Sequence, residues 1–270
     1  QEMAENAVLT HMPRLQKEFF EQNETLDDSI APFRELTSGA VDTLLRISMR
    51  RSERWRKMKY DLKKDNEEIE ESFFVPKEMT VFSWEGEIDT IMTPLDSMKY
   101  YKSFFRPGMM SMDPTNGYIK AWVGGMNYRH FQYDMVKKGK RQIGSTFKPF
   151  VYAAAIDQLK LSPCDTFPDS QFCIEKNKFG NVEQWCPKNS GDKYGRTRTL
   201  KNALANSVNT VTARLMDRIG PRTVVKLAKD LGIEQRILPV PSIALGTPDL
   251  SVYEMVAAYS TFANKGVYTQ

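Results

Sequence analysis

The sequence predicts an α+β fold from two observations. Two short β-type runs, residues 108–112 and 118–123, lie on either side of residues 113–117, which read Asp-Pro-Thr-Asn-Gly. This is the chemistry of a hairpin turn, because proline fixes φ and an Asn-Gly pair accepts positive φ. After residue 146, helical segments follow one another without intervening strands. That order favours α+β over alternating α/β.

Residues 1–75 are expected to form a charged, helical linker or accessory region. An apolar stripe predicts a helix from about Ser38 onward. A basic block over residues 50–59 is followed by an acidic block over residues 61–71. Opposite charges this close together favour a solvated, ion-paired helix surface over contact with an anionic partner.

Residues 76–270 are expected to form the second domain. Val81–Trp84 is a short strand candidate, and Pro94 predicts a helix start because proline is favoured at the first helical position. Ser251 and Glu254 have the spacing of a capping box, which predicts the start of the last helix. The helices expected after the hairpin are 146–158, one after residue 199, 208–220, 221–232 and 251–266.

Composition excludes several classes of protein. Hydrophobic residues make up 41% and charged residues 27% of the chain, which are globular values. The longest apolar run, residues 150–156, is far shorter than the roughly 20 residues of a membrane span. No signal peptide is visible in the first residues given, and a net charge of +4 is too small to predict nucleic-acid binding. Two histidines and three scattered cysteines do not predict a zinc site.

The three cysteines leave two alternatives open. Cys173 and Cys186 flank a polar stretch that has the composition of a hairpin tip. A disulfide between them is compatible with an oxidising compartment. Three free thiols, counting Cys164, fit the sequence equally well.

A nucleophile with a built-in base can be sought through the spacing Ser-x-x-Lys, which occurs twice. Ser190 and Lys193 lie in a loop-like composition with no helix to fix their geometry. Ser145 and Lys148 instead precede a helix-forming run. Residues three apart share a helix face, so this second pair is predicted to be within hydrogen-bonding reach.

Pro149 sharpens the prediction for Ser145. Proline is tolerated in a helix only within its first turn, so Ser145 is expected at the helix start, as N-cap or first residue. The positive end of the helix would stabilise a serine alkoxide and lower the pKa of Lys148, which could then act as a neutral base. The alternative is a serine cap beside a surface lysine.

Ser207 and Asn209 form a second element, Ser-x-Asn, at a junction between two helical runs. A serine there could pass a proton, and an asparagine could hold both the lysine and a substrate carbonyl. An ordinary helix-to-helix cap is the alternative.

Together these motifs resemble the active-site serine penicillin-recognising enzymes, which carry Ser-x-x-Lys, Ser-x-Asn and Lys-Thr-Gly. Longer stretches resemble the class A penicillin-binding proteins, bifunctional peptidoglycan glycosyltransferases and DD-transpeptidases. The resemblance covers roughly residues 75–270 well and 1–75 weakly, as a linker after a glycosyltransferase domain. The matching stretches are residues 113–117, 121–125, 141–150, 199–200, 203–210, 244–246, 257–259 and 262–266.

Three departures from the family pattern bear on function. No Lys-Thr-Gly or Lys-Ser-Gly occurs, so we expect a transpeptidase fold cut short before its last sheet strands, and poor activity of this fragment. The glycosyltransferase domain and the membrane helix of the family are absent from these residues. Val208 occupies the middle of the second motif, where the class A β-lactamases carry aspartate.

The resemblance implies a cell-wall enzyme on the periplasmic face of the bacterial inner membrane, with no cofactor or metal. Its catalytic residues would be Ser145, Lys148, Ser207 and Asn209. Its partners would be peptidoglycan stem peptides, lipid II-derived glycan strands, β-lactams and, through a membrane-anchored full-length protein, other cell-envelope proteins, with no nucleic acid. The residues expected to contact substrate are Gly144, Thr146 and Trp185.

Two rival functions remain at this point. A serine β-lactamase needs a general base for deacylation, and Glu183 is the nearest acid in a plausible loop. A non-catalytic sensor or scaffold is favoured by the missing third motif.

Overall fold

The computed structural model describes residues 1–23, 33 and 36–269, and these fall into two compact units. One unit comprises residues 2–107 and 125–132, and the other comprises Gln1, 108–124 and 133–270. Strands pair in four separate two-stranded antiparallel sheets within the described residues: β1–β2, β3–β4, β5–β8 and β6–β7. This mixture of helices and short antiparallel strands confirms the predicted α+β class.

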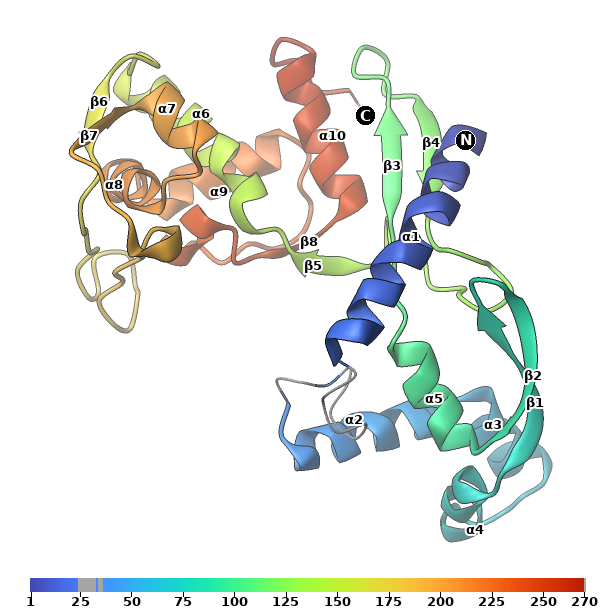
Figure 1. Cartoon of the computed structure of the whole chain (residues 1–270). Coiled ribbons are helices and arrows are strands. Elements are labelled where there is room, and N and C mark those ends of the chain that lie inside the picture. The colour runs from blue at the N-terminus through green and yellow to red at the C-terminus, as the bar shows by residue number, and fades with distance from the viewer. Residues whose placement is uncertain (24–32, 34–35, 270) are drawn as a thin grey trace. The chain divides into compact units, whose positions relative to one another are not determined.

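The unit of residues 2–107 and 125–132 is a set of helices with one hairpin. Phe82, Phe104 and Phe131 form one buried aromatic cluster in it, while Met49, Ile69 and Phe73 form a second. Its elements are α1 (Glu2–Asn23), α2 (Ser38–Arg51), α3 (Glu53–Arg56), the π-helix η1 (Lys57–Asp61), α4 (Asn66–Glu71), the 3₁₀ helix η2 (Ser72–Phe74), β1 (Lys77–Ser83), β2 (Gly86–Met92) and α5 (Pro94–Lys102) (Figure 1).

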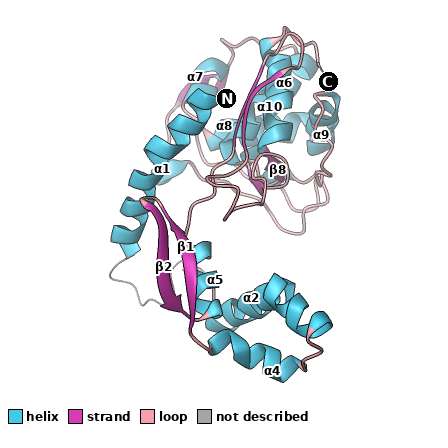
Figure 2. Cartoon of the chain, turned by 90° about the vertical axis from the view of Figure 1, so that its right-hand side faces the viewer, coloured by secondary structure: helices cyan, strands magenta, loops and turns pink. Residues whose placement is uncertain are grey.

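The hairpin of this unit extends beyond the strand predicted from the sequence. β1 pairs with β2 from Lys77↔Met92 to Ser83↔Gly86, and Figure 2 shows the two strands side by side. The second strand was not predicted because most of its residues are exposed, Ile88 and Ile91 included. Such a strand lacks the buried apolar face on which a strand prediction depends.

The ion-paired surface expected around residues 50–71 is only partly present. Arg46 pairs with Glu70 at 3.3 Å, and Lys64 pairs with Glu68 at 2.6 Å. Arg50 and Arg51 at the end of α2 and Arg56 on α3 make no ion pair with a described residue.

The other unit holds the remaining elements and the larger core. They are β3 (Met109–Met112), β4 (Ile119–Val123), β5 (Lys140–Gln142), η3 (Gly144–Phe147), α6 (Lys148–Leu159), β6 (Thr166–Pro168), η4 (Ser190–Asp192), β7 (Thr197–Thr199), α7 (Leu200–Ala205), α8 (Asn209–Ile219), α9 (Pro221–Asp230), η5 (Pro241–Leu245), β8 (Asp249–Ser251) and α10 (Val252–Ala263). The predicted turn joins β3 to β4, with Gly117 at a φ of 76°.

Helix α6 lies at the centre of this core and packs against α7, α8 and α9 (Figure 1). Phe150 and Val151 of α6 are fully buried, as are Val211 and Leu215 of α8. Burying side chains of this size stabilises each by about 1.5–3 kcal/mol relative to an exposed position. The two helices that carry the motif residues Lys148 and Asn209 are therefore fixed to each other by the core.

A disulfide joins Cys173 to Cys186, which settles the alternative that the sequence left open. Between them, Ile174 and Trp185 form an isolated antiparallel bridge. Cys164 is free and exposed. Across the described part of the chain, no helix is both long and apolar enough to cross a bilayer.

Candidate active site

The turn before α6 presents Ser145. The chain leaves β5 and reaches this turn through Gly144, whose φ is +56°, and whose N–H donates to the carbonyl of Gly246 at 2.9 Å. A Cβ on Gly246 would lie 1.7 Å from the Gly144 oxygen. Glycine at position 246 therefore permits the close approach of two loops that holds the serine turn in place.

Ser145 lies in a 3₁₀ turn, Gly144–Phe147, and Lys148 is the first residue of α6. The helix therefore begins later than the sequence predicted, and Ser145 precedes it. The physical reason is the proline at position 149, which donates no hydrogen bond. The turn ahead of it closes through the tighter bond from the Lys148 N–H to the Ser145 carbonyl.

Lys148 is the buried cation of the site, with its side chain 1% exposed. Its Nζ donates to three oxygens: the Ser207 carbonyl at 2.6 Å, Ser207 Oγ at 2.9 Å and Asn209 Oδ1 at 2.6 Å. These bonds use all three protons of an ammonium group. Burial lowers the pKa of Lys148 from 10.5 to about 8, because an apolar environment disfavours the charged form.

Ser207 connects the lysine to the nucleophile candidate. Its Oγ lies 3.0 Å from Ser145 Oγ, while Lys148 makes no direct hydrogen bond to the Ser145 side chain among the described contacts. The direct hydrogen bond that the three-residue spacing predicted is therefore not made, because Ser145 lies in the 3₁₀ turn ahead of α6 and not on the face of that helix. Ser207 has a φ of +53°, in a left-handed region that a non-glycine residue enters at a cost. Its hydroxyl contacts both Lys148 Nζ and Ser145 Oγ.

The structure brings the four predicted catalytic residues together. The path runs Lys148 Nζ, Ser207 Oγ, Ser145 Oγ, and Asn209 Oδ1 accepts a further hydrogen bond from Lys148 Nζ. When Lys148 is charged, its Nζ donates to Ser207 Oγ, and the Ser207 hydroxyl donates to Ser145 Oγ. With the lysine neutral, the same distances allow each hydroxyl to donate in the opposite direction, so that a proton can move from Ser145 to Lys148.

The residues predicted to contact substrate have fewer described contacts with the site than the four predicted catalytic residues. Gly144 and Thr146 flank Ser145, and the Thr146 carbonyl accepts from the Tyr259 hydroxyl at 2.5 Å. Trp185 packs against the large core. No described contact joins Trp185 to the four-residue path, so its substrate role stays a prediction.

The second Ser-x-x-Lys pair is not organised as a site. Ser190 begins a short 3₁₀ turn and Lys193 follows it in extended conformation, and both are exposed. Glu183, the acid that a β-lactamase would use, is exposed too. Its carbonyl accepts from Asn181 at 2.7 Å, and no described contact joins its carboxylate to Ser145.

Sequence reasoning missed the residues that surround the Ser207–Asn209 turn, above all Asp169 and Asn189. Asp169 is 0% exposed and pairs with Arg198 at 2.6 Å. Burial opposes the ionisation of Asp169, but hydrogen bonds, led by that from Arg198, hold its pKa below the usual range. Asn189 lies 20 residues away in the chain and bonds to Asp169. No local sequence signal marks either residue, because their partners are distant in the chain.

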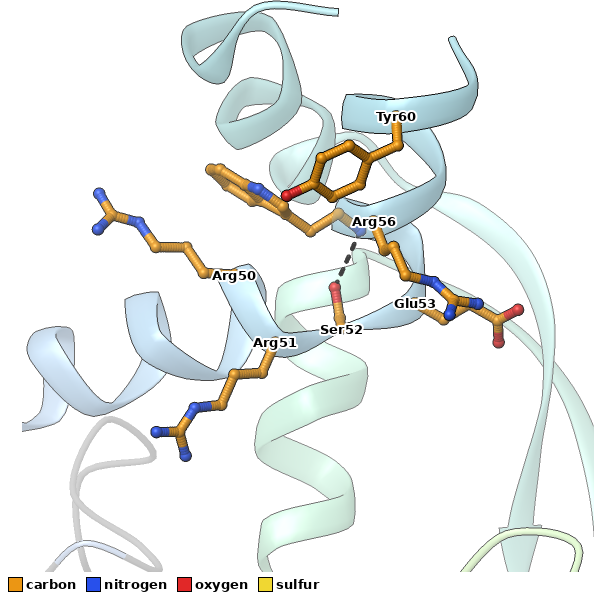
Figure 3. Close-up of a pocket in the computed structure, with 7 residues that line it drawn as sticks. Arg50, Arg51, Ser52, Glu53, Arg56 and Tyr60 are labelled. Atoms are coloured by element: carbon orange, nitrogen blue, oxygen red, sulfur yellow. Dashed lines mark hydrogen bonds between the residues drawn. The ribbon is translucent and has the colours of Figure 1, made fainter. Parts of the chain in front are cut away.

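The unit of residues 2–107 and 125–132 contains a different charged region, a cavity of about 560 Å³. In Figure 3, Arg50 and Arg51 extend to one side, and Arg56 extends to the other. None of the three guanidinium groups makes an ion pair with a described residue. The residues that line this cavity are Arg50, Arg51, Ser52, Glu53, Trp55, Arg56 and Tyr60. The three guanidinium groups do not converge on one point, as they would around a single bound anion.

Comparison with known proteins gives two family matches. Residues 28–105 match the family described as "Penicillin-binding protein middle domain", and residues 107–270 match "Penicillin binding protein transpeptidase domain". Penicillin-binding protein 1A of Aquifex aeolicus is 35% identical over 160 residues, which is 58% of this chain and 21% of that protein. Penicillin-binding protein 1A of Neisseria lactamica is 35% identical over 159 residues, 58% of this chain and 20% of that protein.

Solved structures of penicillin-binding proteins also match this chain. Penicillin-binding protein 1A from Haemophilus influenzae superposes with a TM-score of 0.54 at 30% identity, covering 58% of this chain and 23% of that chain. PonA1 from Mycobacterium tuberculosis gives a TM-score of 0.52 at 27% identity, covering 60% of this chain and 44% of that chain. The chain thus spans about a fifth of the length of the curated relatives that it matches. With its hairpin, its serine turn and more than half of its length matched, the chain belongs to the penicillin-binding protein transpeptidase family.

Proposed function

We propose that this chain is the acyl-transfer part of a peptidoglycan DD-transpeptidase, and that Ser145 is its nucleophile. The observation that carries the proposal is the path from the buried Lys148 Nζ through Ser207 Oγ to Ser145 Oγ, at 2.9 and 3.0 Å. A serine linked to a lysine of lowered pKa is the arrangement that activates a hydroxyl without a histidine.

In the first half-reaction, Ser145 Oγ attacks the carbonyl between the two terminal D-alanines of a stem peptide. Its proton passes through Ser207 to neutral Lys148. The Ser145 backbone N–H would donate to the oxyanion, and removing one such donor costs about 2.7–4 kcal/mol in serine hydrolases. As the C–N bond breaks, the terminal D-alanine takes a proton from the relay and leaves, and the stem remains as an ester on Ser145.

In the second half-reaction, an amine of a neighbouring stem attacks this ester. The amine loses a proton to the relay, the C–O bond to Ser145 breaks, and Ser145 recovers its proton as the peptide cross-link forms. The same serine would be acylated by β-lactams, whose strained amide takes the place of the D-alanyl-D-alanine bond. Asn209, through its bond to Lys148, orients the base and lies beside the substrate.

The remaining parts of the proposal follow from the family. Gly144, Thr146 and Trp185 would contact substrate. The protein would work on the outer face of the cytoplasmic membrane on peptidoglycan strands, within a membrane-anchored protein with cell-envelope partners. A polypeptide restricted to residues 1–270 has no Lys-Thr-Gly. We expect it to acylate slowly, because the second oxyanion donor is expected beside that motif.

Labelling with a fluorescent penicillin, followed by peptide mapping, tests the nucleophile. The protein to use is the product of the whole gene that encodes this chain. The parent should carry one label on Ser145, Ser145→Ala should carry none, and the matched control Ser190→Ala should be labelled like the parent. A label on Ser190, or one that survives Ser145→Ala, would refute the assignment. Repeated rapid turnover of nitrocefin would instead indicate a β-lactamase.

A further inference from the structure

Asp169 is the centre of a buried polar network next to the proposed site. Its carboxylate accepts from Arg198 Nε at 2.6 Å and from the Gly195 N–H at 2.9 Å through Oδ2. Through Oδ1 it accepts from Asn189 Nδ2 at 2.7 Å and from the Thr210 hydroxyl at 2.8 Å. A buried charge with this many partners has a fixed position. The network therefore offers a rigid anchor for whatever is bonded to it.

Asn189 connects this anchor to the start of α8. Its Nδ2 donates to Asp169 and also to the Lys193 carbonyl at 3.0 Å. Its Oδ1 accepts from the backbone N–H groups of Asn209 at 3.0 Å and Thr210 at 3.2 Å. These are the first two residues of α8. All the side-chain hydrogen-bonding groups of Asn189 thus point at defined partners.

The start of α8 has no cap of its own. The residue before the helix is Val208, which has no side-chain oxygen, and no side-chain cap bond is made there. A helix leaves its first N–H groups without intrahelical partners, and a side-chain oxygen from the N-cap usually satisfies one of them. Asn189 supplies that oxygen from a loop 20 residues away in the chain.

The neighbouring residue completes the hold on Asn209. The Lys188 carbonyl accepts from Asn209 Nδ2 at 2.7 Å. Because the amide nitrogen is occupied there, Asn209 Oδ1 faces Lys148 Nζ at 2.6 Å. Two consecutive residues of one loop therefore fix both the backbone and the side-chain direction of Asn209, which in turn touches the proposed base.

We propose that Asn189, which touches none of the reacting groups, is a positioning residue for acyl transfer: its Oδ1 caps α8 and so fixes Asn209 against Lys148. This inference rests on the proposed function, because it assigns a role within the same site. Displacement of a catalytic group by about 1 Å can lower a rate about 100-fold, even when the substitution is remote from the reacting atoms.

The test compares Asn189→Ala with Asn189→Asp in the same whole-gene protein, measuring the rate constant of penicillin acylation at saturation and the midpoint of thermal unfolding. Asn189→Ala removes the cap and should acylate Ser145 about 10- to 100-fold more slowly, with a smaller change in the affinity for penicillin before acylation. Asn189→Asp keeps the oxygen that caps α8, so its acylation rate should stay close to that of the parent. It also places a second carboxylate against Asp169, which should lower its unfolding midpoint at neutral pH.

The deciding observation is that Asn189→Asp acylates faster than Asn189→Ala although its own unfolding midpoint is lowered. A purely structural role would not produce this order of acylation rates. Acylation rates that simply followed the unfolding midpoints of the folded variants would overturn the inference, as would a parental rate for Asn189→Ala. Should Asn189→Ala not fold, Asn189→Asp decides alone: a near-parental rate despite a lowered midpoint supports the inference, and a rate that falls with the midpoint overturns it.

Asn181→Ala is the matched control, since Asn181 Nδ2 likewise donates to two acceptors in a loop, the carbonyls of Glu175 and Glu183, while Asn181 makes no described hydrogen bond to α8. It should acylate at the parental rate. Labelling of Ser145 in the parent separates the two claims. If Ser145 is not labelled, the proposed function fails. If Ser145 is labelled and Asn189→Ala acylates normally, only the present inference fails.

Discussion

Two positively charged regions within the described residues differ in how their cations are surrounded. Lys148 is buried and donates to three oxygens. Arg50, Arg51 and Arg56, at the cavity of the other unit, are exposed and have no ionic partner among the described residues (Figure 3). A buried cation loses its hydration and must be held by oriented acceptors, whereas an exposed guanidinium keeps its water. Charge alone therefore does not mark a site, but a desolvated charge with arranged partners does.

The largest effect should come from the buried cation. Lys148→Met removes the proposed base, and general base catalysis contributes about 10²–10⁴ in rate. We expect penicillin acylation of Ser145 to fall by that factor. The matched control, Arg50→Gln, removes an exposed cation and should leave the rate constant unchanged. A Lys148→Met protein that acylates at the parental rate would show that burial of this lysine has no catalytic consequence.

The supporting ion pair should have the next largest effect. Asp169 is fully buried and accepts from four donors, and leaving several buried donors without an acceptor costs about 3–5 kcal/mol in all, at about 1–3 kcal/mol for each. Asp169→Ala should lower the free energy of unfolding by that amount in denaturant titrations. Glu70→Ala, which breaks the exposed pair with Arg46, should cost no more than about 1 kcal/mol. Equal losses for the two variants would contradict the contrast between buried and exposed charges.

The pH dependence of acylation gives a third comparison. The pKa of Lys148 is lowered to about 8 by burial, so the neutral base becomes more populated as pH rises through that value. The acylation rate should rise about tenfold per pH unit below pH 8 and level off above it. Arg51→Gln should leave this profile in place. A rate that is flat between pH 6 and 8 would mean that Lys148 is not the titrating group.

The same shift has a consequence for stability, and its dependence on pH has the same sign as that of a paired carboxylate, because both groups have a lowered pKa in the folded state. The folded-state pKa of Lys148 lies below its ordinary value of 10.5, so the unfolded chain binds more protons between about pH 8 and 10.5. The free energy of unfolding contributed by this group therefore rises with pH across that window and is constant outside it. Comparing the parent with Lys148→Met in denaturant titrations isolates the contribution, which should disappear in the variant.

The smallest effects should come from the arginines around the cavity. Single substitutions of Arg50, Arg51 or Arg56 by glutamine should change the free energy of unfolding by no more than about 0.5 kcal/mol, as surface substitutions usually do. Thermal unfolding of the three variants checks this. A loss well above 1 kcal/mol for any of them would reveal a buried partner and would remove the contrast with Lys148.

The sequence predicted those features whose signals are local. The turn at residues 113–117, the capping box of Ser251 and Glu254 and the start of α8 after Val208 each depend on neighbours within a few positions. Ser145 and Lys148 were found for the same reason, because Pro149 marks the helix start. The prediction was less accurate for the turn itself, which is 3₁₀ rather than α-helical at Ser145.

Only the tertiary structure decided how these pieces act together. Lys148 meets Ser207 across 59 residues of chain, and Asn209 depends on a loop 21 residues away. Whether a lysine is buried or exposed follows from the packing of α6 against α8, not from its neighbours in sequence. Local patterns specify helices, turns and caps, whereas desolvation and long-range hydrogen bonds arise only when the core forms. The sequence thus determined which residues could react, and the fold determined that Lys148 is desolvated and connected to Ser145.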